Sequence, residues 1–285
     1  MTARMTTPTQ LALLEPEPPV LAASTTQLRL VNLNVQHASP SRSRAQVAWL
    51  ADQEHADVAV LTEVGTGPGG DTLVQALSEA GYRGIIAPVS AGDYRTVIAS
   101  RLPALEPVPS GVSFLAHRAP AAKLRIGETT VGLLGLYVPS RGPKERKNED
   151  KRAFQAAVTE SLRRIVTELG GLVVVTGDLN VVEPGHEPHH AVFGTWEYDF
   201  YRSFADAGLT DAFRALHPDA TEHSWFGRAG NGYRFDHAFL TAEHQQLLTA
   251  CSYLHAPRHE GISDHSAMAV VADLPDTQGP ARSRR

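Results

Sequence analysis

Polar side chains that can do chemistry follow or precede several apolar runs of this sequence. They are Asn34 after LRLVNL, Glu63 after VAVLT, Tyr137 after GLLGL, Asp178 and Asn180 around LVVVTGDLN, Asp236 inside YRFDHAFL, and Asp264–His265 before SAMAV. Asp and Asn often mark turns for local hydrogen-bonding reasons. Turn chemistry does not call for Glu63, Tyr137 or His265, and strand ends gathered at one sheet edge are a common place for catalytic groups.

The side-chain types in this set indicate phosphate-ester chemistry. Carboxylate and amide oxygens are hard ligands that suit Mg²⁺, or Mn²⁺, rather than zinc. A hard cation neutralises phosphoryl oxygens while a neighbouring base activates water. The sequence has neither a GxSxG elbow nor a GxxxxGK[ST] phosphate loop. His186, His189 and His190 offer a second conceivable metal site, for which a solvated loop is the alternative.

Alternating strand and helix patterns must position these residues. Strands are predicted at 28–35, 57–62, 94–100, 122–126, 130–138, 172–176, 233–240, 250–255 and 266–272, and helices at 44–54, 71–80, 147–169 and 197–207. So many strands with so few helices do not suit a doubly wound parallel sheet. Two sheets packed face to face with helices outside fit better.

Composition and charge limit the class of protein. The 285 residues are 42% hydrophobic and carry a net charge of −5, which excludes a protein that holds DNA by bulk electrostatics. A local basic groove around an acidic metal site would still serve a nuclease. Cys251 is the single cysteine, so no internal disulfide forms and a cytoplasmic location is expected. No signal peptide or membrane-length apolar run is found.

The chain is expected to form one domain. Residues 1–26 are rich in Thr, Pro and Ala and are expected to be a disordered leader, and residues 276–285 a disordered tail. No linker-like run or internal repeat interrupts residues 27–275.

The motifs, in their order along the chain, resemble those of the endonuclease/exonuclease/phosphatase superfamily. The matching stretches are LNVQH, LTEVG, GLYVPS, GDLN, YRFDHAFL and SDH, which span most of the chain. The resemblance implies an α/β fold with a four-layer α/β/β/α sandwich of two mostly antiparallel sheets, as in DNase I-like proteins. It also implies a Mg²⁺-dependent phosphodiesterase, with Mn²⁺ as the alternative cofactor.

The resemblance assigns roles to the strand-end residues. Glu63 is the principal metal ligand, with Asn34 and Asp264 beside it. Asp178 is the base or the carboxylate that positions water, Asn180 orients the same water or the phosphate, and Tyr137 donates to a phosphate oxygen. His265 stabilises charge on the phosphate, and Asp236 orients its imidazole in a carboxylate–histidine pair. His237 should face the opposite side of its strand and be structural.

Residues 207–240 are most similar to the exonuclease III type of abasic-site endonuclease. The segment contains Asp211–Pro218, then Ser224–Trp225, then Arg234–Asp236, which match that family's pattern. The substrate-binding residues expected from it and from the basic segment after Tyr137 are Arg141, Lys144, Trp225 and Arg234. A solvated helix start is the alternative for the basic segment, which also includes Arg146, Lys147, Lys151 and Arg152.

Two loops depart from the family pattern. VVEPGHEPHH follows GDLN where the family often has Pro-Thr-Asp, and VGTGPGG follows Glu63 where a Lys-containing segment is usual. Both border the expected substrate groove. The sequence thus predicts a monomeric enzyme acting on nucleic acid, with duplex DNA as substrate. The alternatives are an RNA substrate, a phosphatase or phosphodiesterase for inositol, lipid or other small phosphoesters, and a non-catalytic binding module.

Overall fold

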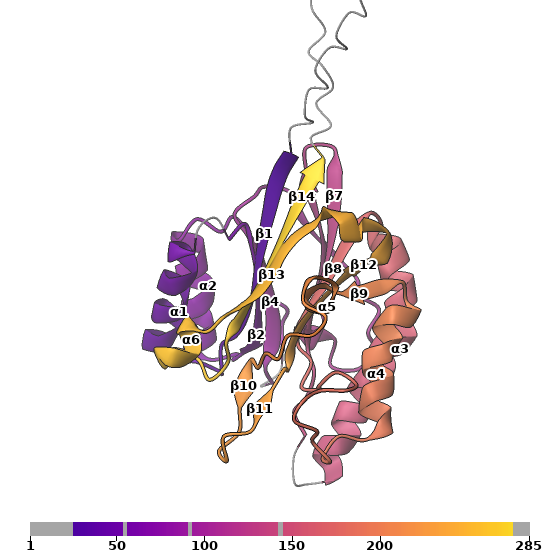
Figure 1. Ribbon diagram of the computed structural model, residues 1–285. Coiled ribbons are helices and arrows are strands. Elements are labelled where there is room, and N and C mark those ends of the chain that lie inside the picture. The colour runs from indigo at the N-terminus through magenta and orange to yellow at the C-terminus, as the bar shows by residue number, and fades with distance from the viewer. Residues whose placement is uncertain (1–24, 54–55, 91–92, 142–144, 276–285) are drawn as a thin grey trace, which may run out of the picture.

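The computed structural model describes residues 25–53, 56–90, 93–141 and 145–275. Two six-stranded sheets pack face to face, and helices cover their outer faces (Figure 1). In each of these sheets one neighbouring pair of strands is parallel and the others are antiparallel. The predicted four-layer sandwich is therefore confirmed.

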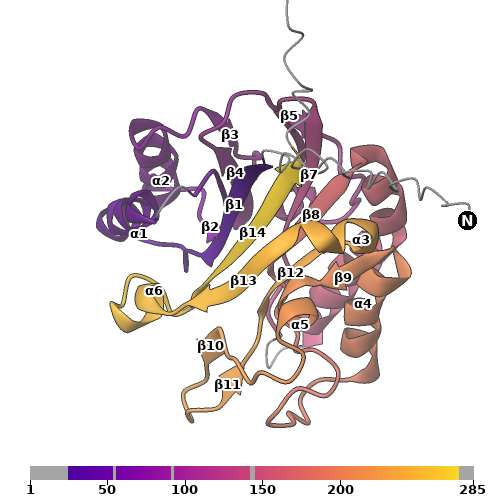
Figure 2. The same cartoon turned by 45° about the horizontal axis from the view of Figure 1, so that its top comes forward.

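The first sheet places the amino-terminal and carboxy-terminal strands side by side. Its order is β13 (Leu248–Leu254), β14 (Ala267–Pro275), β1 (Thr25–Asn34), β2 (Val58–Val64), β4 (Arg95–Ser100) and β3 (Gly84–Ile86). β1 begins where β14 ends, because Thr25 pairs with Pro275 (Figure 2). β1 thus takes in two residues that the sequence assigned to the leader. Residues 1–24 and 276–285 lie outside the described residues.

The second sheet has the order β5 (Leu105–Val108), β6 (Ala121–Ile126), β7 (Thr129–Tyr137), β8 (Leu172–Asp178), β12 (Asp236–Thr241) and β9 (Leu209–Asp211). Its parallel pair is β7 and β8, as β1 and β2 are in the first sheet. A small hairpin of β10 (Trp225–Phe226) and β11 (Gly232–Tyr233) stands apart from both sheets.

Helices α1 (Pro40–Asp52) and α2 (Pro68–Glu79) cover the first sheet, and α3 (Glu145–Leu169) and α4 (Thr195–Asp206) cover the second (Figure 1). The cap of α1 is Ser39, whose hydroxyl accepts from the Arg42 backbone N–H. α3 ends before Gly170 and Gly171, which both adopt positive φ.

Side-chain alternation along β1 separates two of the cores. Leu28 and Leu30 belong to the core between the sheets, whereas Val31 and Leu33 pack with α1 and α2. This two-residue period is what a strand buried on both faces requires. Asn32 and Asn34 follow on the face that looks toward the second sheet, and both are fully buried.

The predicted strand at 233–240 is wrong as one element. β11 ends at Tyr233 and β12 begins at Asp236, because the Phe235 backbone N–H donates to Ser224 Oγ and its carbonyl accepts from Leu179 N. The sequence reading also missed short elements: β3, β5, β9, α5 (Ala212–Leu216), α6 (Ala256–His259) and the 3-10 turns Ala116–Arg118 and Ala242–Leu247.

Candidate active site

Three neighbouring strands of the second sheet bring their polar residues into one row. Tyr137 is opposite Asp178 across β7 and β8, and Asp178 is opposite Asp236 across β8 and β12. Gly177 permits this packing, since a Cβ atom there would lie 1.9 Å from the Leu136 carbonyl oxygen. The end of β1 faces this row from the first sheet, so the two sheets meet at one polar edge.

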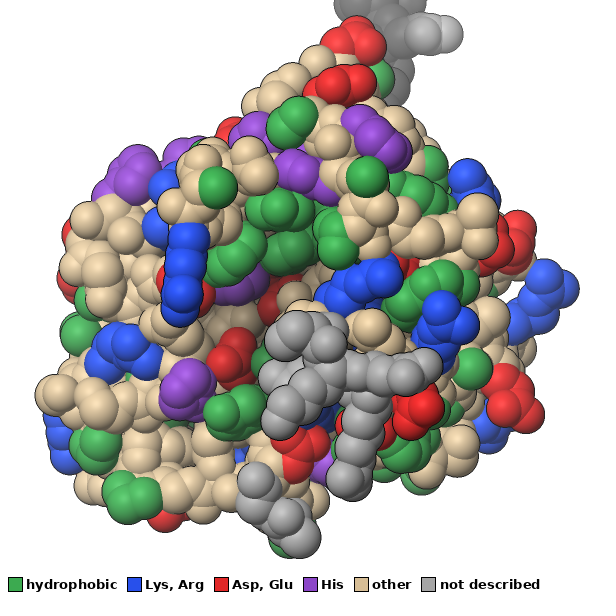
Figure 3. Space-filling model, turned by 90° about the horizontal axis from the view of Figure 1, so that it is seen from below, with side chains coloured by type: hydrophobic (Ala, Val, Ile, Leu, Met, Phe, Trp, Pro, Cys, Tyr) green, Lys and Arg blue, Asp and Glu red, His purple; other side chains and the backbone are tan. Residues whose placement is uncertain are grey.

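A groove of about 530 Å³ opens at this edge. Seen from this end of the molecule, the surface is hollowed, and acidic, histidine and hydrophobic side chains surround the hollow (Figure 3). The groove is lined by Glu63, Tyr94, Tyr137, Ser140, Arg141, Asp178, Asn180, Val192, Phe193, Trp225, Tyr233, Phe235, Asp264 and His265. Most of the sequence-predicted site residues therefore share one space.

Asp236 and His265 form a buried carboxylate–histidine pair. His265 Nδ1 lies 2.7 Å from Asp236 Oδ2, which leaves Nε2 for the groove. Burial by itself lowers the pKa of His265, but the charges of Asp236, Asp178 and Asp264 and the bond to Asp236 outweigh it and raise the pKa to about 10. The imidazole is therefore charged at neutral pH.

Asp178 is a buried carboxylate surrounded by amide donors. Oδ1 accepts from Asn180 N at 2.9 Å, and Oδ2 accepts from Asn34 Nδ2 at 2.9 Å and from Asn180 Nδ2 at 3.0 Å. Burial raises the pKa of Asp178 to about 7; His265 and the amide bonds oppose the rise, and Asp236 adds to it. Asp178 is thus poised to exchange a proton near neutral pH.

Glu63 lies at an irregularity of the first sheet. The register of β2 against β4 shifts between Leu61 and Val64, and Glu63 adopts φ +57°. A β-bulge of this kind at a sheet edge changes the direction in which a side chain points. Glu63 Oε2 accepts from Asn34 Nδ2 at 3.0 Å. Asn34 Oδ1 accepts from Gln36 N at 2.8 Å, which fixes the amide so that its nitrogen faces Glu63 and Asp178.

The donor set fits a hard divalent cation. Mg²⁺ usually keeps several waters and binds through one or two carboxylates together with substrate phosphate. Glu63 and Asp264 both line the groove, and Asp264 Oδ1 is buried without a hydrogen-bond partner within the described residues. No group of three or more His, Cys, Asp or Glu side chains among the described residues is placed to hold a metal ion, so a cation here would also need water and substrate phosphate as ligands. The ligand roles of Glu63, Asn34 and Asp264 stay predictions.

Tyr137 lines the groove as a neutral phenol. Burial and the nearby carboxylates of Glu63 and Asp178 raise the pKa of Tyr137 well above its usual value, while Arg118 acts in the opposite direction. The Arg118 guanidinium lies 4.6 Å from the ring centroid and is held by Asp93 at 2.5 Å. Tyr137 therefore keeps its hydroxyl proton and can donate it in a hydrogen bond.

Aromatic side chains form one wall of the groove. Trp225 stacks on Phe235 with 5.6 Å between ring centroids, and Tyr233 stacks on the same ring at 5.0 Å. Phe193 meets Tyr233 and Phe235 edge-on. Trp225 Nε1 also donates to Asp264 Oδ2 at 3.0 Å, so this wall and the acidic groups are directly joined. Phe226, in the same hairpin, does not line the groove.

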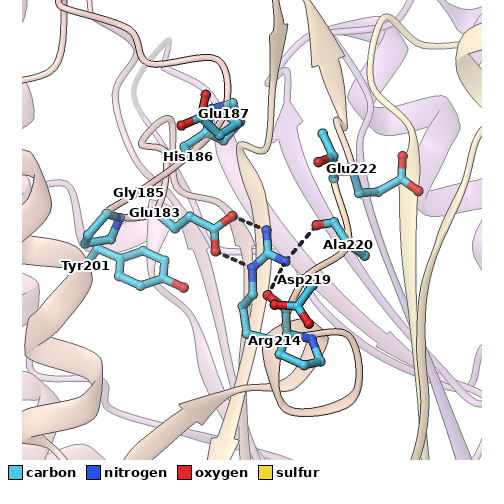
Figure 4. A pocket seen from close by; sticks show the side chains of 12 residues that line it. Glu183, Gly185, His186, Glu187, Tyr201, Arg214, Asp219, Ala220 and Glu222 are labelled. Atoms are coloured by element: carbon cyan, nitrogen blue, oxygen red, sulfur yellow. Dashed lines mark hydrogen bonds and ion pairs between the residues drawn. The ribbon is translucent and has the colours of Figure 1, made fainter.

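The prediction that Arg234 binds substrate is wrong. Its side chain is fully buried, and Nη2 lies 2.5 Å from Glu183 Oε2 and 2.8 Å from Asp211 Oδ2. A buried guanidinium needs such partners, and the loop before β12 turns this side chain inward. Glu183 also binds Arg214 at the wall of a second pocket of about 480 Å³ (Figure 4).

The described basic residues that follow Tyr137 lie in two different environments. Arg141 lines the groove, where it donates to Glu197 Oε2 at 2.8 Å and to the Val192 carbonyl. Lys151 is fully buried, donates to Asn180 O at 2.8 Å and pairs with Glu197 at 2.5 Å, so it cannot contact phosphate. Lys144 lies outside the described residues, as do the side chains of Arg146 and Lys147.

The histidine loop does not form a metal site in the described part of the chain. His186 donates through Nδ1 to Pro188 O and accepts at Nε2 from Arg234 N. His190 Nε2 bonds Gly232 O, and its ring stacks on Tyr233 at 4.0 Å, while His189 is exposed. The rings of His186 and His190 therefore support the loop. His237 does the same from β12, through its bond to Val181 O.

Sequence reasoning missed Asn32. Asn32 Nδ2 donates to Asp236 Oδ1 at 3.2 Å, so the first sheet holds the carboxylate that holds His265. The available signal was its spacing of two residues from Asn34, which puts both amides on one face of β1. Lys151 was missed as a support of Asn180, since nothing in a helical pattern reveals which cation becomes buried.

Comparison with known proteins places this geometry in a family. The model of the Endonuclease/Exonuclease/phosphatase family matches residues 31–265. An AP endonuclease from Archaeoglobus fulgidus is similar in structure, with 22% identity, a TM-score of 0.72, and coverage of 87% of this chain and 100% of that one. A 3'-5' exonuclease, NExo, from Neisseria meningitidis has 24% identity, a TM-score of 0.72 and the same coverage.

A further structure, a variant of the 3' phosphatase NExo from Neisseria bound to a product DNA hairpin, has 22% identity and a TM-score of 0.70, with 85% of this chain and 98% of that chain covered. No curated protein sequence gives a significant match. None of the helices in the described residues is long and apolar enough to cross a membrane. The family match spans the strands that carry the polar edge, and this chain belongs to the endonuclease/exonuclease/phosphatase family of hydrolases.

Proposed function

We propose that this chain is a divalent-metal-dependent phosphodiesterase that hydrolyses the DNA backbone, as an abasic-site endonuclease and 3′-exonuclease in DNA repair. The observation that carries the proposal is the groove, where a buried carboxylate, a carboxylate-paired histidine and an aromatic wall face one space. The described activities of the Archaeoglobus and Neisseria proteins support DNA as the substrate. We expect the chain to act as a cytoplasmic monomer.

The proposed chemistry divides among residues already in place. Asp178 accepts a proton from the water that attacks phosphorus, and its pKa near neutrality suits this exchange. The bond from phosphorus to the 3′ oxygen breaks as the new bond forms, and the leaving oxygen takes up a proton from solvent. His265 donates from Nε2 to a phosphoryl oxygen and stabilises the charge that develops there. Tyr137 donates to a second phosphoryl oxygen. Glu63 and Asp264 would hold the divalent cation, which would supply further neutralisation of the phosphate. The expected product ends are a 3′-hydroxyl and a 5′-phosphate.

The aromatic wall supports an abasic substrate. A nucleotide without its base exposes a compact sugar, and Trp225, Tyr233 and Phe235 offer ring faces and edges against which it can pack. A small phosphoester is the second candidate. It is favoured by the scarcity of cations, because Arg141 is the one Lys or Arg among the described residues that line the groove.

A metal-dependent cleavage assay tests the proposal. Abasic duplex DNA and a phosphoinositide should be offered side by side, with EDTA, Mg²⁺ or Mn²⁺. We expect cleavage of the abasic duplex that disappears in EDTA and returns with metal. Full activity in chelator would exclude the proposed mechanism. Turnover of the phosphoinositide but not of the DNA would favour the second candidate function, hydrolysis of a small phosphoester.

Trp225 provides a test of substrate recognition. Trp225→Ala should lower kcat/KM for abasic duplex by roughly 10–100-fold and that for a small aryl phosphodiester much less, since stacking is worth roughly 1–3 kcal/mol. Trp225→Phe keeps a ring but loses the bond to Asp264, so it separates packing from positioning. Phe226→Ala, in the same hairpin but outside the groove lining, is the control. Equal losses on both substrates would contradict this role.

A further inference from the structure

A second histidine–carboxylate pair lies beside the groove, on the first sheet. His37 Nδ1 is 3.0 Å from Glu63 Oε1, and 55% of the His37 side chain is exposed. We propose that His37 is a nitrogen ligand of the cation that Glu63 binds, and that the site therefore prefers Mn²⁺ to Mg²⁺. This inference rests on the divalent-metal dependence of the proposed function.

The backbone holds His37 beside Glu63 at a cost. Gln36 and His37 both adopt positive φ, at 51° and 36°, although neither is glycine. Such conformations cost roughly 1–3 kcal/mol each and persist where the surroundings enforce them. His37 N donates to Glu63 O at 3.0 Å, and Arg42 Nη1 of α1 donates to Gln36 Oε1 at 2.9 Å. The turn is thus fixed from β2 and from α1.

The donor atoms are arranged as a ligand pair. Glu63 Oε2 accepts from Asn34 Nδ2, and Glu63 Oε1 shares a hydrogen bond with His37 Nδ1, so a cation bound by both atoms would replace the proton between them. Two neighbouring octahedral ligands, each about 2.1 Å from a metal, lie about 3.0 Å apart. The His37 ring stacks on Tyr94 with 5.3 Å between centroids, which fixes its plane, and Tyr94 lines the groove.

The identity of the donors decides the preferred metal. Mg²⁺ takes oxygen ligands and gains little from imidazole, whereas first-row transition cations accept nitrogen. The other donors at the site, the Glu63 carboxylate together with water and substrate phosphate, are oxygen donors that Mn²⁺ shares with Mg²⁺. No cysteine lines the groove among the described residues, so the site lacks the thiolate that would favour softer metals. Mn²⁺ is the cation that matches this mixed set.

Pulsed EPR of the full chain loaded with Mn²⁺ alone tests the proposal. Wild-type protein should show ¹⁴N hyperfine coupling to Mn²⁺ that is lost in His37→Gln. The Kd for Mn²⁺ should rise by roughly 10–100-fold in that variant, the range seen when groups around a metal are removed. The Kd for Mg²⁺, measured by competition, should change much less. His244→Gln is the control, because His244 lies beside a different glutamate, Glu243, in the 3-10 turn Ala242–Leu247.

Three results would contradict the assignment of His37 as a metal ligand. Coupling that is absent from the wild type, an unchanged Mn²⁺ affinity in His37→Gln, or no Mn²⁺ binding at all would overturn the proposal. DNA cleavage by the wild type is measured in parallel. If coupling is present but no DNA is cleaved, the substrate assignment fails and the ligand assignment stands. Circular dichroism of His37→Gln should match the wild type, because its exposed ring fills no core.

Discussion

Two clusters of buried charged residues adjoin β12, and each contains a carboxylate whose pKa is shifted in the opposite direction from that in the other cluster. The proposed catalytic cluster, Asp178, Asp236 and His265, has two carboxylates around one imidazolium. The structural cluster, Glu183, Asp211, Arg214 and Arg234, has two carboxylates around two guanidiniums. The pKa of Asp178 is raised to about 7, whereas that of Glu183 is lowered to about 2.

The main difference lies in charge balance. Burial raises the pKa of both Asp178 and Glu183, but only Glu183 has two guanidiniums within bonding distance to reverse it. The structural cluster is therefore fully ionised and stabilises the fold. The catalytic cluster keeps one acid that is costly to ionise, which suits the proposed role of Asp178 as a proton acceptor near neutral pH.

The largest expected effect comes from removing the titrating groups of the catalytic cluster. Asp178→Asn and His265→Ala should each lower kcat by roughly 10²–10⁴. Asp178→Asn should change the melting temperature little, because removing a disfavoured buried carboxylate offsets the hydrogen bonds from Asn34 and Asn180 that the new amide nitrogen cannot accept. Steady-state kinetics and thermal denaturation check this. A large loss of stability in Asp178→Asn would place Asp178 with the structural cluster.

Breaking the structural cluster should have the opposite effect, lowering the stability of the fold while leaving kcat nearly unchanged. Arg234→Met leaves Asp211 buried without its main cation, and should lower the free energy of unfolding by about 3–5 kcal/mol. Chemical denaturation measures this loss. The variant that remains folded at low temperature should keep kcat within a few-fold of wild type, and Arg202→Met, at an exposed ion pair with Asp199, is the control. A kcat loss as large as that of His265→Ala would contradict the division into two clusters.

The two members of the catalytic pair should act as a unit. If Asp236 works by holding His265, then the double variant Asp236→Asn/His265→Ala should lose little more activity than His265→Ala alone. A double-mutant cycle on kcat measures the overlap. Losses that simply multiply would show that Asp236 acts independently.

Acid should weaken the structural cluster. The pKa of Glu183 is about 2 in the folded chain against the usual 4.5, so its ionised form stabilises the fold above about pH 4.5. This contribution, about 2 kcal/mol after allowance for solvent screening, is lost as pH falls from 4.5 toward 2. Denaturation between pH 6 and 3 should show the slope in wild type and a shallower one in Glu183→Gln.

The smallest expected effect concerns Asn32. Removing its bond to Asp236 in Asn32→Ala should lower kcat by about 3–10-fold, which is what one hydrogen bond of roughly 1 kcal/mol supports, with KM nearly unchanged. Asn32→Asp should do more harm, because it places a like charge against Asp236. An unchanged kcat in both variants would show that the catalytic cluster ends at Asp236.

The fold and most of the candidate site could be predicted from the sequence, because both depend on local periodicity. Apolar runs with a period of two residues indicated the main strands, and polar residues at their ends marked Asn34, Glu63, Tyr137, Asp178 and His265. These side chains meet because neighbouring strands place their ends at one sheet edge. The motif order then pointed to the family that the comparisons show.

Only the tertiary structure decided which polar groups face the groove and which are neutralised inside the fold. Arg234 and Trp225 stand in one motif, yet the first is buried against Glu183 and Asp211 and the second lines the groove. Asn32 and Lys151 became supports of Asp236 and Asn180 through contacts between distant segments. Local sequence sets the direction of a side chain along its own strand or helix. Its partner, charge state and pKa depend on groups far away in the chain, which only folding brings within bonding distance.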